Sequence, residues 1–325
     1  MNASRPRFGV AGRARPVASS GSPWFVAGTH RLRAPWRLSV FVGVFIASWM
    51  IANAMLYPLL ATLTSWTETP LAFAGWLMLA ATWAACVVAL RHIDDAPWAS
   101  IGVSRAAWRP AVLWRGTLLG TAAIGATAVL LLVTGTLRAE WLADGTSLAE
   151  WLGAAARMTW LLAPAALWEE LVFRGYLWRV ADDTAGPRVA LWATSAGFAM
   201  VHLLNPGATV QSLTAVFLAG VLLGLVRQAT DSLPAAWLAH LAWNWVMAAV
   251  LHVPVSGLPF EALGWRLVPT GPDWWTGGAW GPEGGAAAFL VFVAAGAFGL
   301  ARVAHPSTLS TTSSPLTASR ISGSN

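Results

Sequence analysis

The run VLWRGTLLGTAAIGATAVLLLVTGT at residues 112–136 decides the fold class, because over its whole length it carries a single charge, at Arg115. A helix needs about 20 mainly apolar residues to cross the hydrocarbon core of a bilayer. Only 10% of the whole chain is charged, whereas soluble domains have about 25% charged residues. We therefore predict an all-α fold, a polytopic transmembrane helical bundle with lipid as its solvent.

Apolar runs of similar length recur on both sides of this one and predict about eight spans. The expected spans are residues 38–60, 70–90, 112–136, 152–178, 188–204, 209–226, 233–252 and 285–304. Residues 253–284 are rich in Gly, Pro and Trp and are expected to form a loop. We predict a disordered basic cytoplasmic tail at 1–37, a transmembrane helical domain at 38–304 and a disordered C-terminal tail at 305–325.

The charge distribution predicts an orientation in the membrane. The net charge is +6, and the sequence contains arginine but no lysine. A basic balance can indicate nucleic-acid binding, but seven arginines lie within residues 1–37, directly before the first apolar run. That placement, repeated in alternate loops, predicts that both termini face the cytoplasm, and it argues against a nucleic-acid partner. The lysine-free composition fits a GC-rich genome, so a bacterial plasma membrane is expected. The single cysteine, Cys86, excludes an intramolecular disulfide.

Three expected spans concentrate the polar side chains that lipid would disfavour. They are Arg157, Glu169, Glu170 and Arg174 in 152–178, His202 in 188–204, and His240 and Asn244 in 233–252. A charged group at the centre of a bilayer is costly. The first two spans carry almost none, so we expect these residues to converge on one cavity inside the bundle.

Helical spacing predicts how these side chains are arranged. Glu170 and Arg174 lie four residues apart and share a helix face, where an ion pair can form. Glu169 lies about 100° around the helix from Glu170, so the two carboxylates cannot point the same way. His240 and Asn244 are also four apart.

Glutamate, histidine and asparagine together suit the activation of water. A buried glutamate can take a proton from water and return it to a leaving amine, and His and Asn donors can stabilise an oxyanion. No serine or cysteine lies in a comparable setting, which argues against covalent catalysis. A structural ion pair, helix-to-helix hydrogen bonds, a proton-coupled carrier or a non-catalytic scaffold could use the same residues. The carrier is disfavoured because no internal repeat is present.

Three motifs occur in order on successive spans: EELVFRGYL at 169–177, FAMVH at 198–202 and HLAWN at 240–244. Together they resemble the CPBP family of intramembrane endopeptidases, over about residues 150–255. This family includes the CAAX prenyl proteases, proteins similar to lysostaphin resistance protein A, and bacteriocin-processing and immunity proteins. The resemblance implies hydrolysis of a peptide bond near the C-terminus of a membrane-bound protein or peptide.

The resemblance also implies a role for each motif residue. Glu169 would be the general base, His202 would help to hold the water, and His240 with Asn244 would form the oxyanion hole. Glu170, Arg174 and Phe198 would support them. No cofactor is expected. Zinc is the alternative, with Glu169, His202 and His240 as ligands, although the His-Glu-x-x-His motif of zinc proteases is absent. From span lengths, His202 is expected deeper in the membrane than Glu169 and His240. The natural substrate, its prenylation and the oligomeric state are left open by the sequence.

Overall fold

The computed structural model describes residues 22–27, 29, 31–63 and 69–304. Most of the expected N-terminal tail and the whole expected C-terminal tail, 305–325, lie outside these residues. The described part of the N-terminal region is structured. Phe25 pairs with Leu32 in an antiparallel bridge, and helix α1 begins at Ala34, before the expected start of the first span at residue 38.

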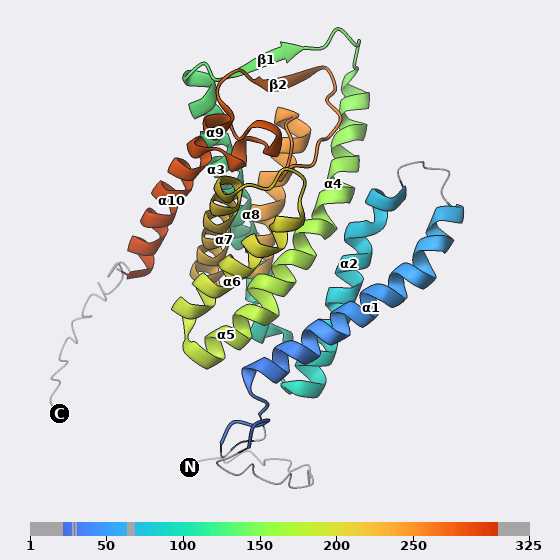
Figure 1. The fold of residues 1–325 in the computed structure, drawn as a ribbon, viewed down its shortest axis with the longest axis vertical. Helices are drawn as coiled ribbons and strands as arrows, with labels where there is room; N and C mark the ends of the chain where they lie inside the picture. Colours follow the sequence, from blue (N-terminus) through green and yellow to red (C-terminus); the bar gives the residue numbers. More distant parts are fainter. Residues whose placement is uncertain (1–21, 28, 30, 64–68, 305–325) are drawn as a thin grey trace, which may run out of the picture.

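Helices make up most of the described chain. The helices are α1 (Ala34–Leu63), α2 (Thr69–Val88), α3 (Pro110–Val133), α4 (Leu148–Glu170), α5 (Leu177–Ala185), α6 (Pro187–Val201), α7 (Val210–Thr230), α8 (Leu233–Trp245), α9 (Asp273–Thr276) and α10 (Ala286–Ala304), and the strands are β1 (Leu137–Trp141) and β2 (Trp265–Pro269). Figure 1 shows α3, α7 and α8 gathered beside the long α4, with α1 and α2 as a separate pair on the other side of α4.

Four helices of the described residues are long and apolar enough to cross a membrane, within Ala34–Leu56, Phe73–Ile93, Pro110–Val133 and Val210–Thr230. The other expected spans are shorter or more charged: α6 has 15 residues and α8 has 13, and α4 ends on two glutamates. The helical class is therefore confirmed, whereas the count of eight crossings stays a prediction.

The expected fourth span is one continuous helical rod. It begins at a capping box in which Ser147 accepts from the backbone N–H of Glu150 while the Glu150 carboxylate accepts from Ser147 N–H. A π-helical stretch, Leu171–Tyr176, joins α4 to α5. The rod ends at Gly186, whose φ of +84° is left-handed. π-Helical turns are rare and often occur at functional sites, because they rotate the side chains that follow relative to those before.

Glycines let α3 and α8 approach closely. A Cβ added at Gly116 would lie 2.1 Å from the carbonyl oxygen of Ala235, and one at Gly120 would lie 2.0 Å from that of Ala239. Neither distance is possible for a real side chain, so these positions admit only glycine. Both matched pairs advance in the same direction along the chain, so α3 and α8 run parallel. The Gly-xxx-Gly spacing thus serves packing inside the bundle.

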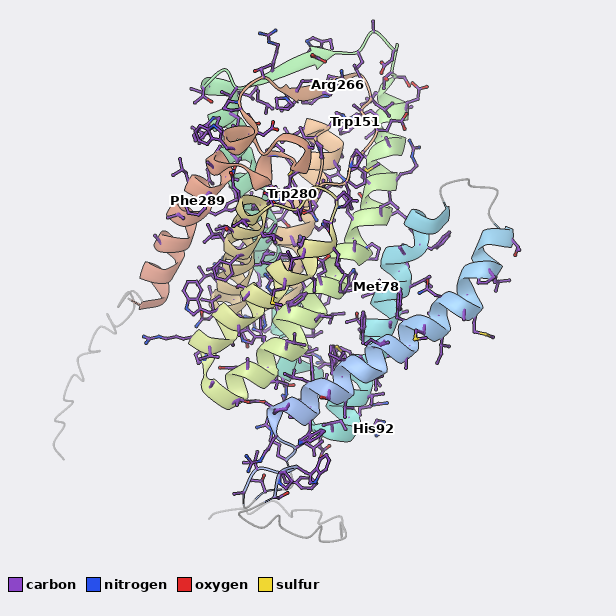
Figure 2. The ribbon with its side chains drawn as sticks, in the orientation of Figure 1. Met78, His92, Trp151, Arg266, Trp280 and Phe289 are labelled. Carbon is purple, nitrogen blue, oxygen red and sulfur yellow. The ribbon has the colours of Figure 1, made fainter. Side chains whose placement is uncertain are left out.

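A two-stranded sheet caps one end of the bundle. β1 and β2 pair antiparallel, with Glu140 opposite Arg266. Their side chains form an exposed ion pair at 3.0 Å. The sheet was not expected from the sequence, which placed β2 in a loop. Figure 2 shows Arg266 and Trp151 at this end of the molecule and His92 at the opposite end.

A buried ionic cluster ties the other end together; we call Arg37, Asp94, Arg179 and Asp183 the clamp cluster. Arg37 donates to Asp94 Oδ2 at 2.7 Å, and Arg179 Nε donates to the same oxygen at 3.3 Å. Arg37 also reaches Asp183 at 3.3 Å. These contacts join α1 and the residue that follows the π-helical stretch Ala89–Ile93 to α5, and Arg37 lies in α1.

Candidate active site

The last turn of α4 and the π-helical stretch after it carry the centre of the site. Glu170 and Arg174 are fully buried, and Arg174 Nη1 donates to Glu170 Oε1 at 3.0 Å. Nη2 of the same guanidinium donates to the carbonyl oxygen of Gly220 on α7 at 2.8 Å. The ion pair expected from the four-residue spacing is therefore present.

His240 on α8 lies between the two glutamates. Its Nδ1 is 3.0 Å from Glu170 Oε1, and its Nε2 is 3.8 Å from Glu169 Oε2. The two carboxylates approach the imidazole at different nitrogens and differ in exposure: the Glu169 side chain is 18% exposed and that of Glu170 is 0% exposed. We call Glu169, Glu170, Arg174 and His240 the site cluster. The two carboxylates thus point in different directions, as the helical spacing predicts.

Phe198 connects the site cluster to His202. The Phe198 ring lies 4.6 Å from the His202 ring and 5.7 Å from the His240 ring, centroid to centroid. The Arg174 guanidinium lies 4.4 Å from the same aromatic centroid, a distance suited to a cation–π contact. His202 lies in a 3₁₀ turn that follows α6. Both histidine rings therefore lie against the same phenylalanine, whereas the expected difference in their membrane depth stays a prediction.

His202 itself is oriented by its own helix. Its Nδ1 lies 2.7 Å from the carbonyl oxygen of Phe198. A carbonyl only accepts hydrogen bonds, so the proton of a neutral His202 ring is on Nδ1 and Nε2 keeps a lone pair. Within the described residues, no hydrogen bond or ion pair joins His202 to either glutamate.

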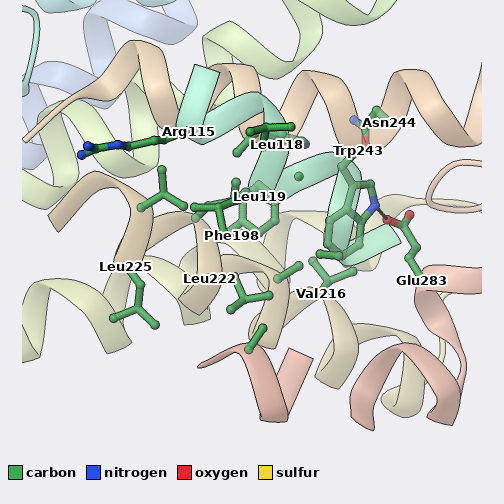
Figure 3. A pocket seen from close by; sticks show the side chains of 18 of the residues that line it. Arg115, Leu118, Leu119, Phe198, Val216, Leu222, Leu225, Trp243, Asn244 and Glu283 are labelled. Atoms are coloured by element: carbon green, nitrogen blue, oxygen red, sulfur yellow. Dashed lines mark hydrogen bonds between the residues drawn. The ribbon is translucent and has the colours of Figure 1, made fainter. Parts of the chain in front are cut away.

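A cavity of about 700 Å³ adjoins the site cluster, between α3, α7 and α8. His202, His240, Asn244 and Phe198 line it, so four expected site residues meet at one hollow. The remaining lining is mainly apolar; Figure 3 shows Leu118, Leu119, Leu222 and Val216 around it. Glu169 is absent from the lining, and its carboxylate lies 3.8 Å from Nε2 of His240, which is part of the lining.

Two expected features are not part of the site. Arg157 is exposed on α4, more than two turns before Glu169. Within the described part of the chain, no three His, Cys, Asp or Glu side chains are grouped so as to hold a metal ion. Glu169, His202 and His240 therefore do not fit a zinc site as they are arranged.

Glu283, in the segment GPEGG at 281–285, is not among the site residues predicted from the sequence. Its buried carboxylate lines the cavity and accepts from Trp243 Nε1 at 2.7 Å. It also accepts from the backbone N–H and the hydroxyl of Ser256, each at 2.7 Å. Glu283 thus fixes Trp243, the neighbour of Asn244. In the sequence, Glu283 stands out only as an acidic residue within a short segment of glycines and a proline.

Comparison with known proteins agrees with the motifs. Residues 150–246 match the family model described as "Type II CAAX prenyl endopeptidase Rce1-like". The matched segment runs from the first turn of α4 past the end of α8 and contains every residue of the site cluster. No curated protein and no solved structure matches the chain. The family resemblance seen in the three motifs is confirmed by this match.

Proposed function

We propose that this chain, whose residues 150–246 match the model of type II CAAX prenyl endopeptidases, hydrolyses a peptide bond of a membrane-bound protein or peptide with a glutamate-activated water. The family supports a CAAX-type intramembrane protease in general. The observation that carries the finer proposal is the site cluster, in which an accessible and a buried carboxylate flank one histidine at the edge of an apolar cavity.

Glu169 is the general base in this proposal. Of the two glutamates, it has the more exposed side chain. A general base must be accessible to the water that it deprotonates. It takes a proton from water, and the resulting hydroxide attacks the carbonyl carbon of the scissile bond. The same carboxyl group then gives the proton to the leaving nitrogen, so that an acid and an amine are released.

His202, His240 and Asn244 act on the water and the oxyanion. With its proton on Nδ1, His202 offers the Nε2 lone pair to the attacking water. His240 and Asn244, one helical turn apart on α8, both line the cavity and supply donors for the negative charge of the tetrahedral intermediate. Because Nδ1–H of His240 is held by Glu170, His240 donates through Nε2 as the imidazolium. Phe198 keeps the two histidines apart and packs against Arg174.

Glu170 and Arg174 are positioning residues. Glu170 accepts from His240 Nδ1, and Arg174 holds Glu170 and the carbonyl of Gly220 at once. This arrangement fixes the His240 ring from three helices. A bidentate guanidinium suits such a role because its donors have a rigid planar geometry.

The cavity suits an apolar substrate segment that enters from the bilayer. Its volume of about 700 Å³ is in the range of small-molecule sites, which are commonly apolar with a few polar groups. The proposal also includes eight membrane crossings, two cytoplasmic termini and a bacterial plasma membrane. The apolar helices and the arginine distribution support these parts. Cleavage then takes place within the membrane domain, with 150–255 as its catalytic core.

The test uses the purified chain in proteoliposomes with a lipid-anchored reporter peptide. We expect Glu169→Gln to reduce kcat by about 10²- to 10⁴-fold, the usual contribution of a general base. Glu150→Gln changes an exposed carboxylate on the same helix and should leave turnover unchanged. Equal cleavage by wild type and Glu169→Gln would refute the mechanism. Binding without cleavage in both would favour a carrier or scaffold. Cleavage that requires stoichiometric zinc would favour the metal alternative.

A further inference from the structure

The segment that precedes α10 crosses the end of the bundle that carries the two-stranded sheet, and we call residues 253–285 the cap segment (Figure 1). It contains β2 and α9, and near its end Glu283 lines the cavity. Trp280 is buried in the same apolar cluster as Phe198. The cap segment therefore belongs to the surroundings of the candidate site, although it lies outside the three motifs.

One oxygen of Glu283 joins the cap segment to α8. Glu283 Oε2 accepts from Trp243 Nε1 at 2.7 Å (Figure 3). The Asn244 amide, next in the chain, has no hydrogen bond to another residue in the part of the chain that the structure describes. The position of this turn of α8 therefore decides where the Asn244 amide lies in the cavity wall.

The other oxygen of Glu283 joins the cap segment to the turn that carries His202. Glu283 Oε1 accepts from the backbone N–H and from the hydroxyl of Ser256, each at 2.7 Å. The carbonyl oxygen of Ser256 accepts from Asn205 Nδ2 at 3.0 Å. The Asn205 backbone N–H donates to the carbonyl oxygen of His202 at 3.1 Å. A continuous row of hydrogen bonds thus leads from the His202 turn through Glu283 to Trp243, and we call the bonds that Glu283 accepts the cap tie.

Backbone packing reinforces the contact between the cap segment and the His202 turn. Gly257 has a left-handed φ of +82°, and a Cβ added there would lie 2.2 Å from the carbonyl oxygen of Pro206. The Gly257 N–H donates to the carbonyl oxygen of Trp280 at 2.9 Å. The two backbones meet without an intervening side chain, so a displacement of the cap segment displaces the His202 turn as well.

We propose that Glu283 is a positioning residue, which holds the His202 turn and the Asn244 turn of α8 at a fixed separation. This inference rests on the proposed function, in which His202 holds the attacking water and Asn244 stabilises the oxyanion. The attacking oxygen and the oxyanion are bonded to the same carbon in the tetrahedral intermediate, so the groups that bind them must keep a fixed distance. A misplacement of about 1 Å can lower a rate about 100-fold.

A carboxylate suits the cap tie because both of its oxygens accept. Within the described residues, the buried Glu283 is reached only by the neutral donors of Ser256 and Trp243. Glutamine has the same length but a single accepting oxygen. Its amide nitrogen would face the N–H of Trp243 or of Ser256, donor against donor, so one half of the cap tie would break while the side-chain volume is retained.

The experiment measures kcat and KM for the lipid-anchored reporter peptide in proteoliposomes. The variants are Glu283→Gln, Trp243→Phe and the double variant; Trp243→Phe removes the indole N–H and keeps an aromatic ring. Two matched controls change the cap segment elsewhere. Glu261→Gln alters an exposed acid. Trp275→Phe removes an indole N–H that donates to Thr136 at 3.1 Å, from a residue that does not line the cavity.

We expect Glu283→Gln and Trp243→Phe each to lower kcat about 10- to 100-fold with KM unchanged. The double variant should be about as active as Glu283→Gln, because both changes break one hydrogen bond. In an Asn244→Ala background, Glu283→Gln should lower kcat far less than in wild type, since the amide that it positions is gone. Both controls should keep the wild-type kcat.

Hydrogen exchange gives a readout that does not depend on cleavage. Glu283→Ala removes both halves of the cap tie, including the acceptor of the Ser256 backbone N–H. Peptides that cover residues 202–209 and 253–258 should therefore lose protection in this variant and keep it in Glu261→Gln. Unchanged protection in Glu283→Ala would refute the cap tie.

The outcomes separate this inference from the proposed function. If wild type and Glu283→Gln cleave with the same kcat, the function stands and the positioning role is refuted. A loss confined to KM would mean that Glu283 contacts the substrate, and equal fold losses with and without Asn244 would mean general destabilisation; either result refutes the positioning role. If wild type does not cleave, both proposals fail, whereas the exchange data still show whether Glu283 joins the two turns.

Discussion

The molecule contains two buried ionic clusters that differ in their surroundings. The site cluster brings together α4, α8 and a carbonyl of α7, beside a cavity of about 700 Å³. The clamp cluster joins α1, α5 and the turn after the π-helical stretch Ala89–Ile93 at one end of the bundle, and none of its four residues lines that cavity. Buried charge alone therefore does not identify an active site. Each cluster keeps one partly exposed carboxylate, Glu169 or Asp183, and the distinguishing feature is that His240 of the site cluster lines a cavity.

Removing the cation of the site cluster is expected to have the largest effect on stability and turnover. Arg174→Gln leaves the fully buried Glu170 without its ion pair. Breaking a buried pair in this way typically lowers the free energy of unfolding by about 3–5 kcal/mol, and we expect turnover to be lost with it. Unfolding in mixed micelles and the cleavage assay measure the two effects.

The control for this change is Arg266→Gln, which breaks an exposed pair with Glu140. Such surface pairs contribute about 0–1 kcal/mol. A loss of stability in Arg174→Gln no larger than in this control would contradict the structural role given to Arg174.

The second prediction concerns the close helix contact beside the site cluster. Gly120→Ala places a Cβ 2.0 Å from the Ala239 carbonyl oxygen, next to His240. Backbone atoms cannot yield as a flexible side chain does, so we expect a loss of about 1–3 kcal/mol of stability from overpacking, together with reduced turnover. Thermal unfolding and the cleavage assay provide the measurement.

Gly125→Ala on the same helix is the matched control, because nothing lies within 4 Å of the added Cβ. It should leave stability unchanged or slightly increase it, since alanine favours helix more than glycine does. Similar behaviour of the two variants would mean that α3 and α8 are not in close contact.

The third prediction tests the clamp cluster. Asp94→Asn removes the charge that Arg37 and Arg179 share, while Asp183 remains to pair with both arginines. We expect a stability loss of about 1–3 kcal/mol, the range for an imperfectly satisfied buried polar group, with kcat retained. Asp95→Asn changes the adjacent exposed acid and should have no effect. A loss of kcat without loss of stability would assign the clamp cluster to catalysis.

The smallest expected effect lies outside both clusters. Backbone N–H groups of Gly264 and Thr146 donate to Asp144 and lower its pKa below the usual 3.8. A depressed pKa in the folded state contributes stability above the unfolded pKa, and this contribution is lost as pH falls through the folded value. The protection of the Gly264 amide against hydrogen exchange, relative to its intrinsic rate at the same pH, should therefore decrease below about pH 3.8 in wild type. Asp144→Asn should show no such pH dependence; equal profiles would contradict the hydrogen bonds.

The sequence predicted those parts of the site that depend on local geometry. The Glu170–Arg174 pair follows from a four-residue spacing on one helix, and the structure has it. The helical class followed from apolar runs of sufficient length, and four helices meet that criterion within the described residues. The three motifs also identified the family that the match to residues 150–246 supports.

Contacts between distant segments could not be predicted in the same way. The pairing of β1 with β2 joins segments more than a hundred residues apart, and neither strand shows an alternation strong enough to indicate a partner. Glu283 reaches Trp243 and Ser256 from a loop without periodicity. A carboxylate between a proline and a glycine has no preferred partner until the helices around it are packed.

By itself, the sequence determined a lipid-embedded helical chain with Glu169, His202, His240 and Asn244 on three of its segments. Only the tertiary structure decided that His240 lies between both glutamates and that Glu169 stays outside the cavity lining. It also decided that Glu283 shares the cavity with the histidines. The physical reason is that helix periodicity sets the direction of a side chain on its own helix, whereas packing at positions such as Gly116 and Gly120 decides what it meets.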